Sequence, residues 1–249
     1  MVQANNATAR DASVAIIGAG DFIGAAICRR FAAEGYLVHG GRRQGEKLQP
    51  LEAEIADAGG RFTGHTLDAR SEEAVTEFLN AANASAPLEA VIFNIGANVN
   101  FPLLETTERV FRKVWEMACY AGFLTGREAA RHLLANGGGS IFFTGATAST
   151  RGGKGYAAFA SAKAGLRLLA QSMARELGPQ NIHVAHLVID AGVDTAFVRD
   201  LYAKRGITEL PEGSLMEPAS IADTYWHLHT QPRDAWTHEL DLRPFAETW

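Results

Sequence analysis

Short runs of apolar residues alternate along the chain with longer stretches in which apolar residues recur at helical spacing. The runs at residues 16–17, 91–93, 141–143 and 184–189 are almost continuously hydrophobic. Strands of this kind are typical of a parallel sheet whose two faces are both covered by helices. The alternation of strand and helix therefore predicts an α/β, single-domain Rossmann fold: a doubly wound parallel sheet of about seven strands with helices on both faces.

The expected strands are residues 13–17, 36–40, 61–66, 90–94, 140–144 and 183–189, with a seventh, edge strand within 236–243. The expected helices are residues 23–34, 45–58, a stretch after Ser71, 108–136 and 156–177. Ser71 followed by two glutamates is typical of a helix start, because serine caps free N–H groups and acids suit the positive helix end. Residues 1–12 are expected to be a flexible leader, and residues 13–249 a single catalytic and dinucleotide-binding domain. Residues 191–218 look irregular and follow a late strand, so we expect a substrate loop there.

Composition excludes several classes of protein. A net charge of -5 over 249 residues argues against nucleic-acid binding, which needs a basic face. No apolar run approaches the length of a membrane span, and the first residues lack the hydrophobic core of a secretion signal. Cys28 and Cys119 lie far apart in helical patterns and are expected to be free thiols, so a cytoplasmic location is expected. His227 and His229 face different sides of a helix, so no metal site is predicted.

A glycine-rich turn follows the first strand and opens the first helix. Its sequence is Gly18-Ala-Gly-Asp-Phe-Ile-Gly24, which predicts cofactor contacts from Gly18, Gly20, Phe22, Ile23 and Gly24. Glycine lets the backbone approach a pyrophosphate, and the helix N-terminus offers free N–H groups and partial positive charge. The strand–turn–helix context is the one that confirms such a motif, so we predict a nicotinamide dinucleotide here.

Two arginines, Arg42 and Arg43, stand at the tip of the second strand, where no acid is present. An acid would bind the ribose hydroxyls of NAD, whereas arginine fits the 2′-phosphate of NADP through charge-assisted bonds. NADP(H) is therefore favoured over NAD(H), the alternative being a solvated surface pair. Asp21 in the turn is poorly suited to a 2′-phosphate, so this prediction rests on the two arginines.

From Val14 to about Arg243 the chain resembles the short-chain dehydrogenase/reductase family. The resemblance rests on the glycine turn, on Asp68 in Leu67-Asp-Ala, on Phe93-Asn-Ile-Gly96 and on Lys163. It implies that Asp68 holds the adenine, that Asn94 and Gly96 back the cofactor, and that Lys163 binds the nicotinamide ribose. Thr195 in the expected substrate loop is included among the cofactor contacts. The resemblance also implies a homodimer or homotetramer built through the helices at 108–136 and 156–177.

Three groups of the family's usual catalytic tetrad are replaced. Phe159 stands four residues before Lys163, where the family has its tyrosine acid, and Ala146 stands where it has a serine. Cys119 occupies the expected asparagine position, and Ile189-Asp190 replaces the usual Pro-Gly after the sixth strand. Only Lys163 of the tetrad remains, so the family's usual mechanism does not carry over.

Hydride transfer to a carbonyl needs a proton donor, and two substitutes are considered. Tyr156 shares a helix face with Lys163, but seven residues span about 10 Å, so it suits a pocket wall or helix start better than an acid. Asp190 lies at the carboxyl end of a strand, where its pKa is expected to be raised for proton donation or where it holds a cationic substrate; a turn-capping role is equally open. His186 in mid-strand is interpreted as a core histidine, and Thr144, Thr147 and Ser149 are further hydroxyl sources.

The predicted catalytic residues are thus Lys163, Asp190 and Tyr156, and the predicted pocket is lined by Ala146, Phe159, Tyr156, Asp190, Phe197 and Tyr202. We expect an NADP-dependent oxidoreductase acting on a hydrophobic carbonyl or imine. Phe159, Ala146 and Asp190 together favour C=N reduction, because an iminium is already charged and benefits from an anion. The competing hypothesis is a catalytically silent NADP-binding sensor or oligomer partner.

Overall fold

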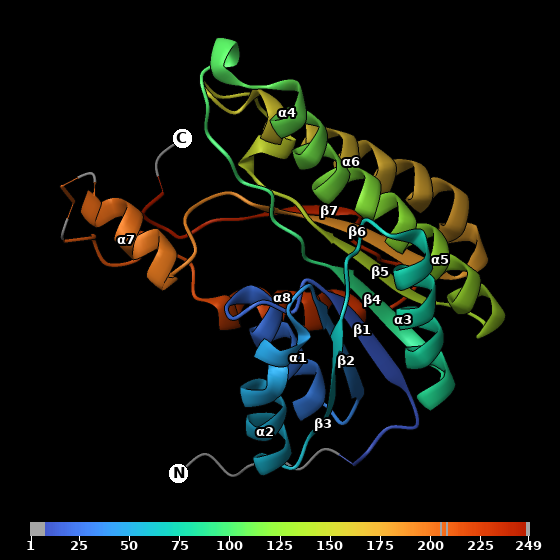
Figure 1. Ribbon diagram of the computed structural model, residues 1–249. Helices are drawn as coiled ribbons and strands as arrows, with labels where there is room; N and C mark the ends of the chain where they lie inside the picture. Colours follow the sequence, from blue (N-terminus) through green and yellow to red (C-terminus); the bar gives the residue numbers. More distant parts are fainter. Residues whose placement is uncertain (1–7, 205, 208, 248–249) are drawn as a thin grey trace.

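The computed structural model describes residues 8–204, 206–207 and 209–247, whose strands form one seven-stranded parallel sheet (Figure 1). The strand order is β3-β2-β1-β4-β5-β6-β7, so the chain winds outward from β1 in both directions. The strands are β1 Ser13–Ile17, β2 Leu37–Arg42, β3 Arg61–Thr66, β4 Leu88–Phe93, β5 Gly139–Thr144, β6 Ile182–Ile189 and β7 Glu239–Leu242. This confirms the predicted doubly wound sheet.

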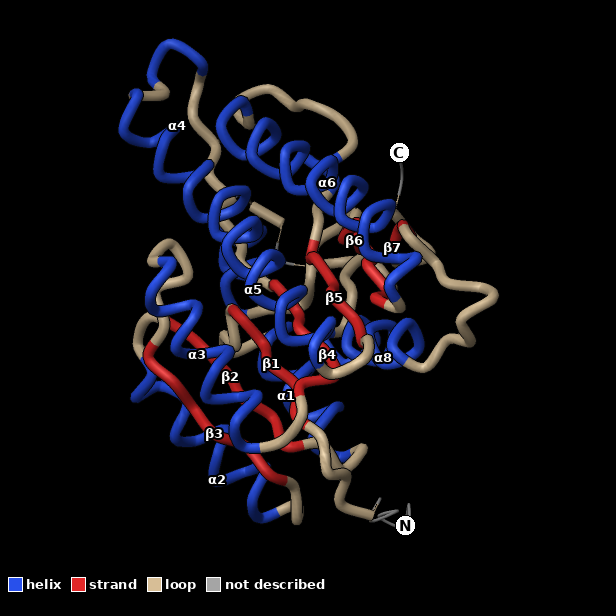
Figure 2. Tube along the Cα trace, turned by 90° about the vertical axis from the view of Figure 1, so that its right-hand side faces the viewer, coloured by secondary structure: helices blue, strands red, loops and turns tan. Residues whose placement is uncertain are grey.

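Helices cover both faces of the sheet, as Figures 1 and 2 show from two sides. One face carries α1 Ile23–Ala33, α2 Gln49–Asp57 and α8 Pro218–His229; the other carries α3 Glu72–Ser85, α5 Ala121–Ala135 and α6 Ala157–Leu177. The chain also has α4 Glu108–Trp115, α7 Ala196–Lys204, the π-helical η3 Glu116–Tyr120 and short 3₁₀ turns η1 Gly45–Leu48, η2 Leu103–Glu105, η4 Thr147–Ser149 and η5 Gly178–Gln180.

The core is divided by the sheet, and β1 shows why. Val14 and Ile16 belong to the apolar cluster beneath α1 and α8, whereas Ala15 and Ile17 belong to the cluster beneath α3, α5 and α6. Successive strand side chains point to opposite faces, so a continuous apolar run supplies both clusters at once. The sheet is thereby held rigidly, with the carboxyl ends of its strands along one edge.

Most predicted elements are confirmed, and two differ in their interior. Ser71 caps α3 by accepting a hydrogen bond from the Ala74 N–H at 3.2 Å. The helix predicted at 108–136 is interrupted by one π turn, Glu116–Tyr120, a form that recurs at functional sites. The segment expected to be irregular, 191–218, contains α7. No residue of α7 is buried among those described, and the helix is short, although Phe197, Leu201 and Tyr202 recur at helical spacing.

At the end of the predicted leader, Arg10 and Ala12 belong to the folded domain. The Arg10 N–H donates to Gly35 O at 2.9 Å, and its guanidinium lies 4.8 Å from the centroid of the Tyr36 ring. Ala12 is buried beside β1. Residues 1–7 of the predicted leader lie outside the described residues.

Within the described ranges, no helix is long and apolar enough to cross a membrane, and no cluster of side chains is suited to hold a metal ion. On α8, His227 is exposed, whereas the ring of His229 packs against Phe31 and Tyr36. The two histidines therefore face different sides of the helix, as their spacing predicts.

Candidate active site

The glycine turn is shaped by what lies against it. Gly18 has φ +92°, and a Cβ there would lie 2.6 Å from Asn94 O. A Cβ on Gly20 would meet nothing within 4 Å in the described part of the chain, so this glycine faces open space. Phe22, which precedes α1, has no side-chain group to cap the helix, and the Ala25 N–H donates to Gly20 O at 2.8 Å. Among the described residues, the N–H groups of Ile23 and Gly24 are left for a ligand. The turn is thus open toward a ligand and presents amide N–H groups to an anion.

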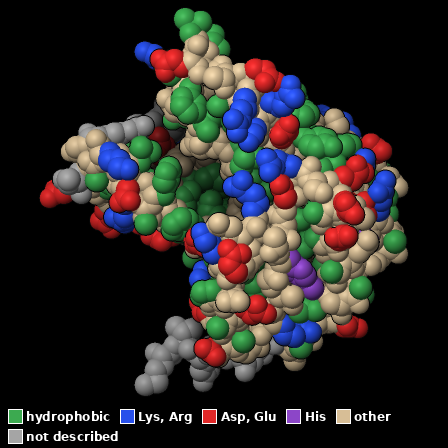
Figure 3. All heavy atoms as spheres, viewed as in Figure 1, with side chains coloured by type: hydrophobic (Ala, Val, Ile, Leu, Met, Phe, Trp, Pro, Cys, Tyr) green, Lys and Arg blue, Asp and Glu red, His purple; other side chains and the backbone are tan. Residues whose placement is uncertain are grey.

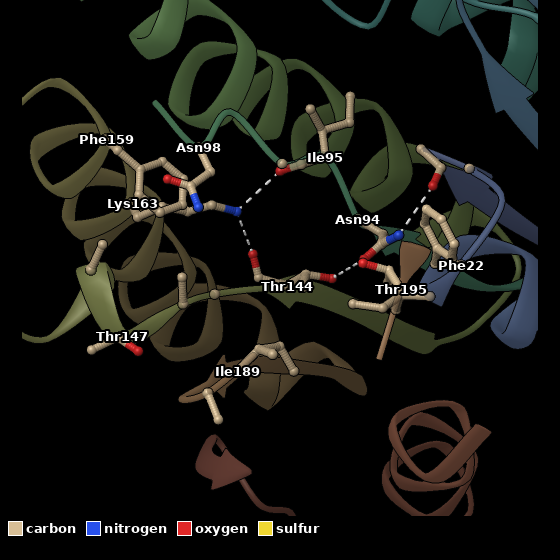
Figure 4. A pocket seen from close by; sticks show the side chains of 18 of the residues that line it. Phe22, Asn94, Ile95, Asn98, Thr144, Thr147, Phe159, Lys163, Ile189 and Thr195 are labelled. Carbon is tan, nitrogen blue, oxygen red and sulfur yellow. Dashed lines mark hydrogen bonds between the residues drawn. The ribbon is translucent and has the colours of Figure 1, made fainter. Parts of the chain in front are cut away.

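A hydrogen-bonded chain ties this turn to the middle of the sheet. Asn94 Nδ2 donates to Gly18 O at 3.1 Å, and Thr144 Oγ1 donates to Asn94 Oδ1 at 2.9 Å (Figure 4). The Thr144 hydroxyl is then the acceptor for Tyr225 OH, 2.6 Å away on α8. Burial raises the pKa of Tyr225, which keeps this phenol protonated as a donor. The ends of β1, β4 and β5 are therefore held in a fixed relation.

Two cavities of about 740 and 590 Å³ adjoin along these strand ends. Both are lined by Gly18, Gly20 and the segment 94–96. The larger cavity continues to Lys163 and to α7, and Figure 3 shows a hollow with hydrophobic side chains between the part that carries α7 and the body of the molecule. The smaller cavity extends to the ends of β2 and β3. Together they form one groove across the topological switch point of the sheet, where open α/β sheets bind ligands.

The smaller cavity is rich in arginine. Its lining includes Arg42, Arg43, Asp68 and Arg70. Arg42 pairs with Asp21 at 2.5 Å, whereas Asp68 is held by Arg70 at 2.6 Å, and this bond lowers the pKa of the carboxyl. Arg70 was missed in the sequence because it follows the family motif at Asp68 rather than standing in it. Three guanidinium groups therefore line the region into which Asp68 was predicted to bring the adenine.

Lys163 lies at the bottom of the larger cavity. It is 2% exposed, and its Nζ donates to Thr144 O at 2.7 Å and to Ile95 O at 3.0 Å (Figure 4). Burial lowers the pKa of this ammonium to about 8. The ring of Phe159, one helical turn earlier, has its centroid 6.0 Å from Nζ. The place of the family's tyrosine is thus filled by a ring without a hydroxyl.

Other predicted pocket residues line the same cavity. Ala146 stands where the family has its serine, and its N–H donates to the buried Ser149 hydroxyl at 3.0 Å. Tyr156 precedes the first turn of α6 and lines the cavity, in keeping with a wall or helix-start residue. Cys119 lies in the π turn, where its Sγ would be 2.9 Å from a Cβ on Gly165 of α6. This cysteine packs between helices.

The raised pKa that was expected of Asp190 is wrong. Burial raises its pKa, but hydrogen bonds from Thr147 at 2.5 Å and Arg243 at 2.9 Å, together with Arg151 at 3.5 Å, outweigh burial and lower it. The carboxylate is thus ionised at neutral pH. Among the described residues its neighbours in sequence line the cavity and Asp190 does not. The two arginines also offset the negative charge with which it was expected to hold a cation.

His186 is a core histidine, as interpreted from the sequence. It is 0% exposed, and its Nδ1 lies 3.1 Å from Glu239 Oε2, a carboxylate that Arg167 also binds. Burial lowers the pKa of His186 to about 4, so the ring is neutral near pH 7. It takes no part in lining the cavity among the described residues.

The segment after β6 supplies the outer wall. Thr195 and Phe197 line the larger cavity, and Thr195 Oγ1 accepts from the Val198 N–H at 3.0 Å at the start of α7. Tyr202 is absent from the described lining, and its hydroxyl lies 3.8 Å from where a Cβ on Gly192 would stand. Its place in the substrate pocket stays a prediction. Residues missed by sequence reasoning are Asn98 and Arg151, which stand on loops without a motif.

Comparisons with known proteins agree with this geometry. A family model described as short chain dehydrogenase matches residues 12–206. A solved short-chain dehydrogenase from Rhodopseudomonas palustris is 61% identical, with a TM-score of 0.83, covering 95% of this chain and 100% of that one. An alcohol dehydrogenase from Thermococcus sibiricus complexed with 5-hydroxy-NADP is 26% identical, with a TM-score of 0.81 and coverage of 95% and 98%.

A curated relative, the uncharacterized oxidoreductase YuxG of Bacillus subtilis, is 35% identical over 180 residues. The match covers 71% of this chain but only 26% of that relative's length.

Proposed function

The chain belongs to the short-chain dehydrogenase family, and we propose that it transfers hydride between NADP(H) and an apolar carbonyl or imine substrate. Members of this family are oxidoreductases, and so is this protein. The observation that carries the proposal is the groove that leads from Arg42, Arg43 and Arg70, past the glycine turn, to the apolar part of the larger cavity at Lys163, which is called the chamber below. Its two ends suit the two parts of the reaction, a phosphorylated dinucleotide and an uncharged substrate.

The residues present fit a bound dinucleotide phosphate. Gly20 leaves open space beside the N-terminus of α1, which suits the pyrophosphate. Arg43 and Arg70 line the smaller cavity. The 2′-phosphate would bind at this end, because guanidinium groups bind phosphate oxygens in pairs. The Thermococcus enzyme, complexed with 5-hydroxy-NADP, supports this choice. When bound, the nicotinamide ring supplies or accepts the hydride.

The walls of the chamber favour an apolar substrate. Ala146, Phe159, Ile189 and Phe197 line it, and the tyrosine and serine hydroxyls of the family are replaced. An oxyanion in such surroundings has few donors, whereas an iminium loses its charge on accepting hydride. The proposal of C=N reduction therefore rests on Phe159 and Ala146. It no longer uses Asp190, whose charge is offset by neighbouring arginines.

We also propose a homodimer or homotetramer assembled through α4, α5 and α6. Phe111, Trp115 and Phe123 are 42%, 42% and 39% exposed on these helices, and aromatic rings are enriched where subunits meet. Cys28 and Cys119 are free thiols, which suits a cytoplasmic location.

The test is an assay of NADPH oxidation with cyclic imines beside ketones of matched size and ring structure. The account expects turnover, with the larger kcat/KM for the imine of each pair. A consistent preference for ketones would remove the imine proposal and leave carbonyl reduction. Tight NADPH binding without turnover over the whole panel would instead favour the silent sensor.

A further inference from the structure

The replacement of tyrosine by Phe159 leaves carbonyl reduction without the family's proton donor. Among the described residues that line the larger cavity, the ionisable side chains are Asp21, Arg151, Tyr156 and Lys163. Asp21 lies at the glycine turn and pairs with Arg42, and a guanidinium such as that of Arg151 does not release its proton in proteins. Two candidates remain at the chamber.

Tyr156 is the weaker of the two. It stands at the helix start, seven residues before Lys163, which places about 10 Å of helix between their backbones. An ordinary phenol has a pKa of about 10, so it needs a close cation to become a good acid near neutral pH. That distance keeps the Lys163 ammonium from serving Tyr156 in this way.

Lys163 is placed and oriented for the task. Its Nζ is held between two backbone carbonyls, Thr144 O at 2.7 Å and Ile95 O at 3.0 Å. An ammonium carries three N–H donors, so these two bonds fix the group and leave one donor for a further acceptor. Phe159 packs one turn away without a hydroxyl to receive that donor. Figure 4 shows Asn98 beside the ammonium.

We propose, on the basis of the hydride transfer proposed above, that Lys163 is itself the proton donor in carbonyl reduction. The carbonyl carbon accepts hydride and is reduced while NADPH is oxidised to NADP⁺. The electron pair of the C–O π bond moves to oxygen, an N–H bond of the ammonium breaks, and an O–H bond forms. The neutral amine then regains a proton from solvent, so atoms and charge balance.

The surroundings of Lys163 support this role. Burial lowers its pKa to about 8, close to the pH at which a general acid works best. Facing it from β6, His186 is neutral near pH 7, and Glu239 behind that ring is bound by Arg167 of α6. Asp190 is bound by Arg243 and Arg151, and burial raises the pKa of the Cys119 thiol on the adjoining π turn. No carboxylate of the described chain pairs with the ammonium, so its proton is not held by a buried ion pair.

The experiment compares Lys163→Arg with the wild-type protein on two apolar substrates, a ketone and an N-alkyl iminium of the same ring system. Arginine keeps the positive charge and N–H donors but does not release a proton. Hydride addition to the iminium gives a neutral amine directly and needs no proton. We expect kcat for the ketone to fall by roughly 10²–10⁴-fold, and kcat for the iminium by less than about tenfold.

Three further measurements separate the possible outcomes. The NADPH dissociation constant, from cofactor fluorescence, is expected to stay within about fivefold in Lys163→Arg, which distinguishes proton transfer from cofactor holding. In wild-type protein, ketone reduction is expected to decline above about pH 8 while iminium reduction stays level. Adding Phe159→Tyr to the Lys163→Arg variant is expected to restore part of the ketone activity.

Equal losses with ketone and iminium, or a level pH profile with the ketone, would overturn the proton role. Wild-type turnover of the iminium but of no ketone would overturn it as well, while leaving hydride transfer intact. Turnover of neither substrate would mean that the proposed function itself fails. If Lys163→Arg does not fold, as judged by circular dichroism, the wild-type pH profiles of the two substrates decide.

Discussion

Two glycines of the phosphate-binding turn should respond in opposite ways to the same added methyl group. A Cβ on Gly18 would lie 2.6 Å from Asn94 O and 2.8 Å from the carbon of that carbonyl, and φ at this residue is +92°. A Cβ on Gly20 would meet no atom of the described residues within 4 Å. Gly18→Ala is therefore expected to damage the fold, and Gly20→Ala the cofactor site alone.

The magnitude for Gly18→Ala follows from two costs. A left-handed backbone costs an alanine about 1–2 kcal/mol, and overpacking against fixed backbone costs about 1–3 kcal/mol more. The sum, about 2–5 kcal/mol, corresponds to a Tm lower by roughly 4–20 °C in a domain of this size. For Gly20→Ala we expect a Tm within about 2 °C of wild type, because alanine is at least as favourable as glycine where space is open.

For Gly20→Ala the effect should instead appear in the affinity for NADPH. If the pyrophosphate lies against Gly20, a methyl group there removes close charge-assisted hydrogen bonds worth about 1.5–3 kcal/mol, or about 10–150-fold in the NADPH dissociation constant. Thermal melts without cofactor and fluorescence titrations with NADPH measure the two effects separately. Unchanged NADPH affinity in a stable Gly20→Ala protein would refute the placement of the pyrophosphate.

Three further predictions follow from other parts of the groove and core. Arg43→Ala and Arg70→Ala should each raise the dissociation constant of NADPH by about tenfold or more, and that of NADH by less than about threefold. Equal losses of affinity for the two cofactors would contradict a 2′-phosphate site here. Burial lowers the pKa of His39 to about 4, below its unfolded value, so its contribution to stability is present above about pH 6.5 and is lost as pH falls through about 4. Urea unfolding should therefore show a lower free energy of unfolding at pH 4.5 than at pH 7. Equal free energies at the two pH values would count against this assignment. Asp190→Asn should destabilise the protein by roughly 1.5–3 kcal/mol in urea unfolding, since it removes the charge from the hydrogen bonds of a part-buried ion pair. Tyr156→Phe should keep turnover within about threefold, and a larger loss would restore the phenol as an acid.

The sheet and the cofactor groove were predictable because their signals are local. Buried strands read as continuous apolar runs, and the glycine turn stands between a strand and a helix, so the position of Gly18 followed from the pattern. Lys163 followed from the resemblance to the family. The substitutions at Phe159 and Ala146 were also visible, since they are read by counting back from Lys163. These residues do line one cavity.

What the sequence did not predict depends on contacts between distant segments. The charge state of Asp190 is set by Thr147 and by Arg243, 53 residues further on, and no spacing rule brings those groups together. The helix α7 spans only Ala196–Lys204 and buries none of its described residues, so its few apolar positions did not distinguish it from a loop. The depressed pKa of Lys163 likewise arises from burial that only the folded chamber creates.

The central claim is that this groove delivers hydride from NADPH to a C=O or C=N carbon in the apolar chamber. The most direct measurement uses NADPH carrying deuterium at the transferring position of nicotinamide C4, incubated with the enzyme and a matched cyclic imine and ketone. Mass spectrometry of the products should find one deuterium on the carbon that had been part of the double bond. Products without deuterium, or no product beside intact bound cofactor, would contradict the account.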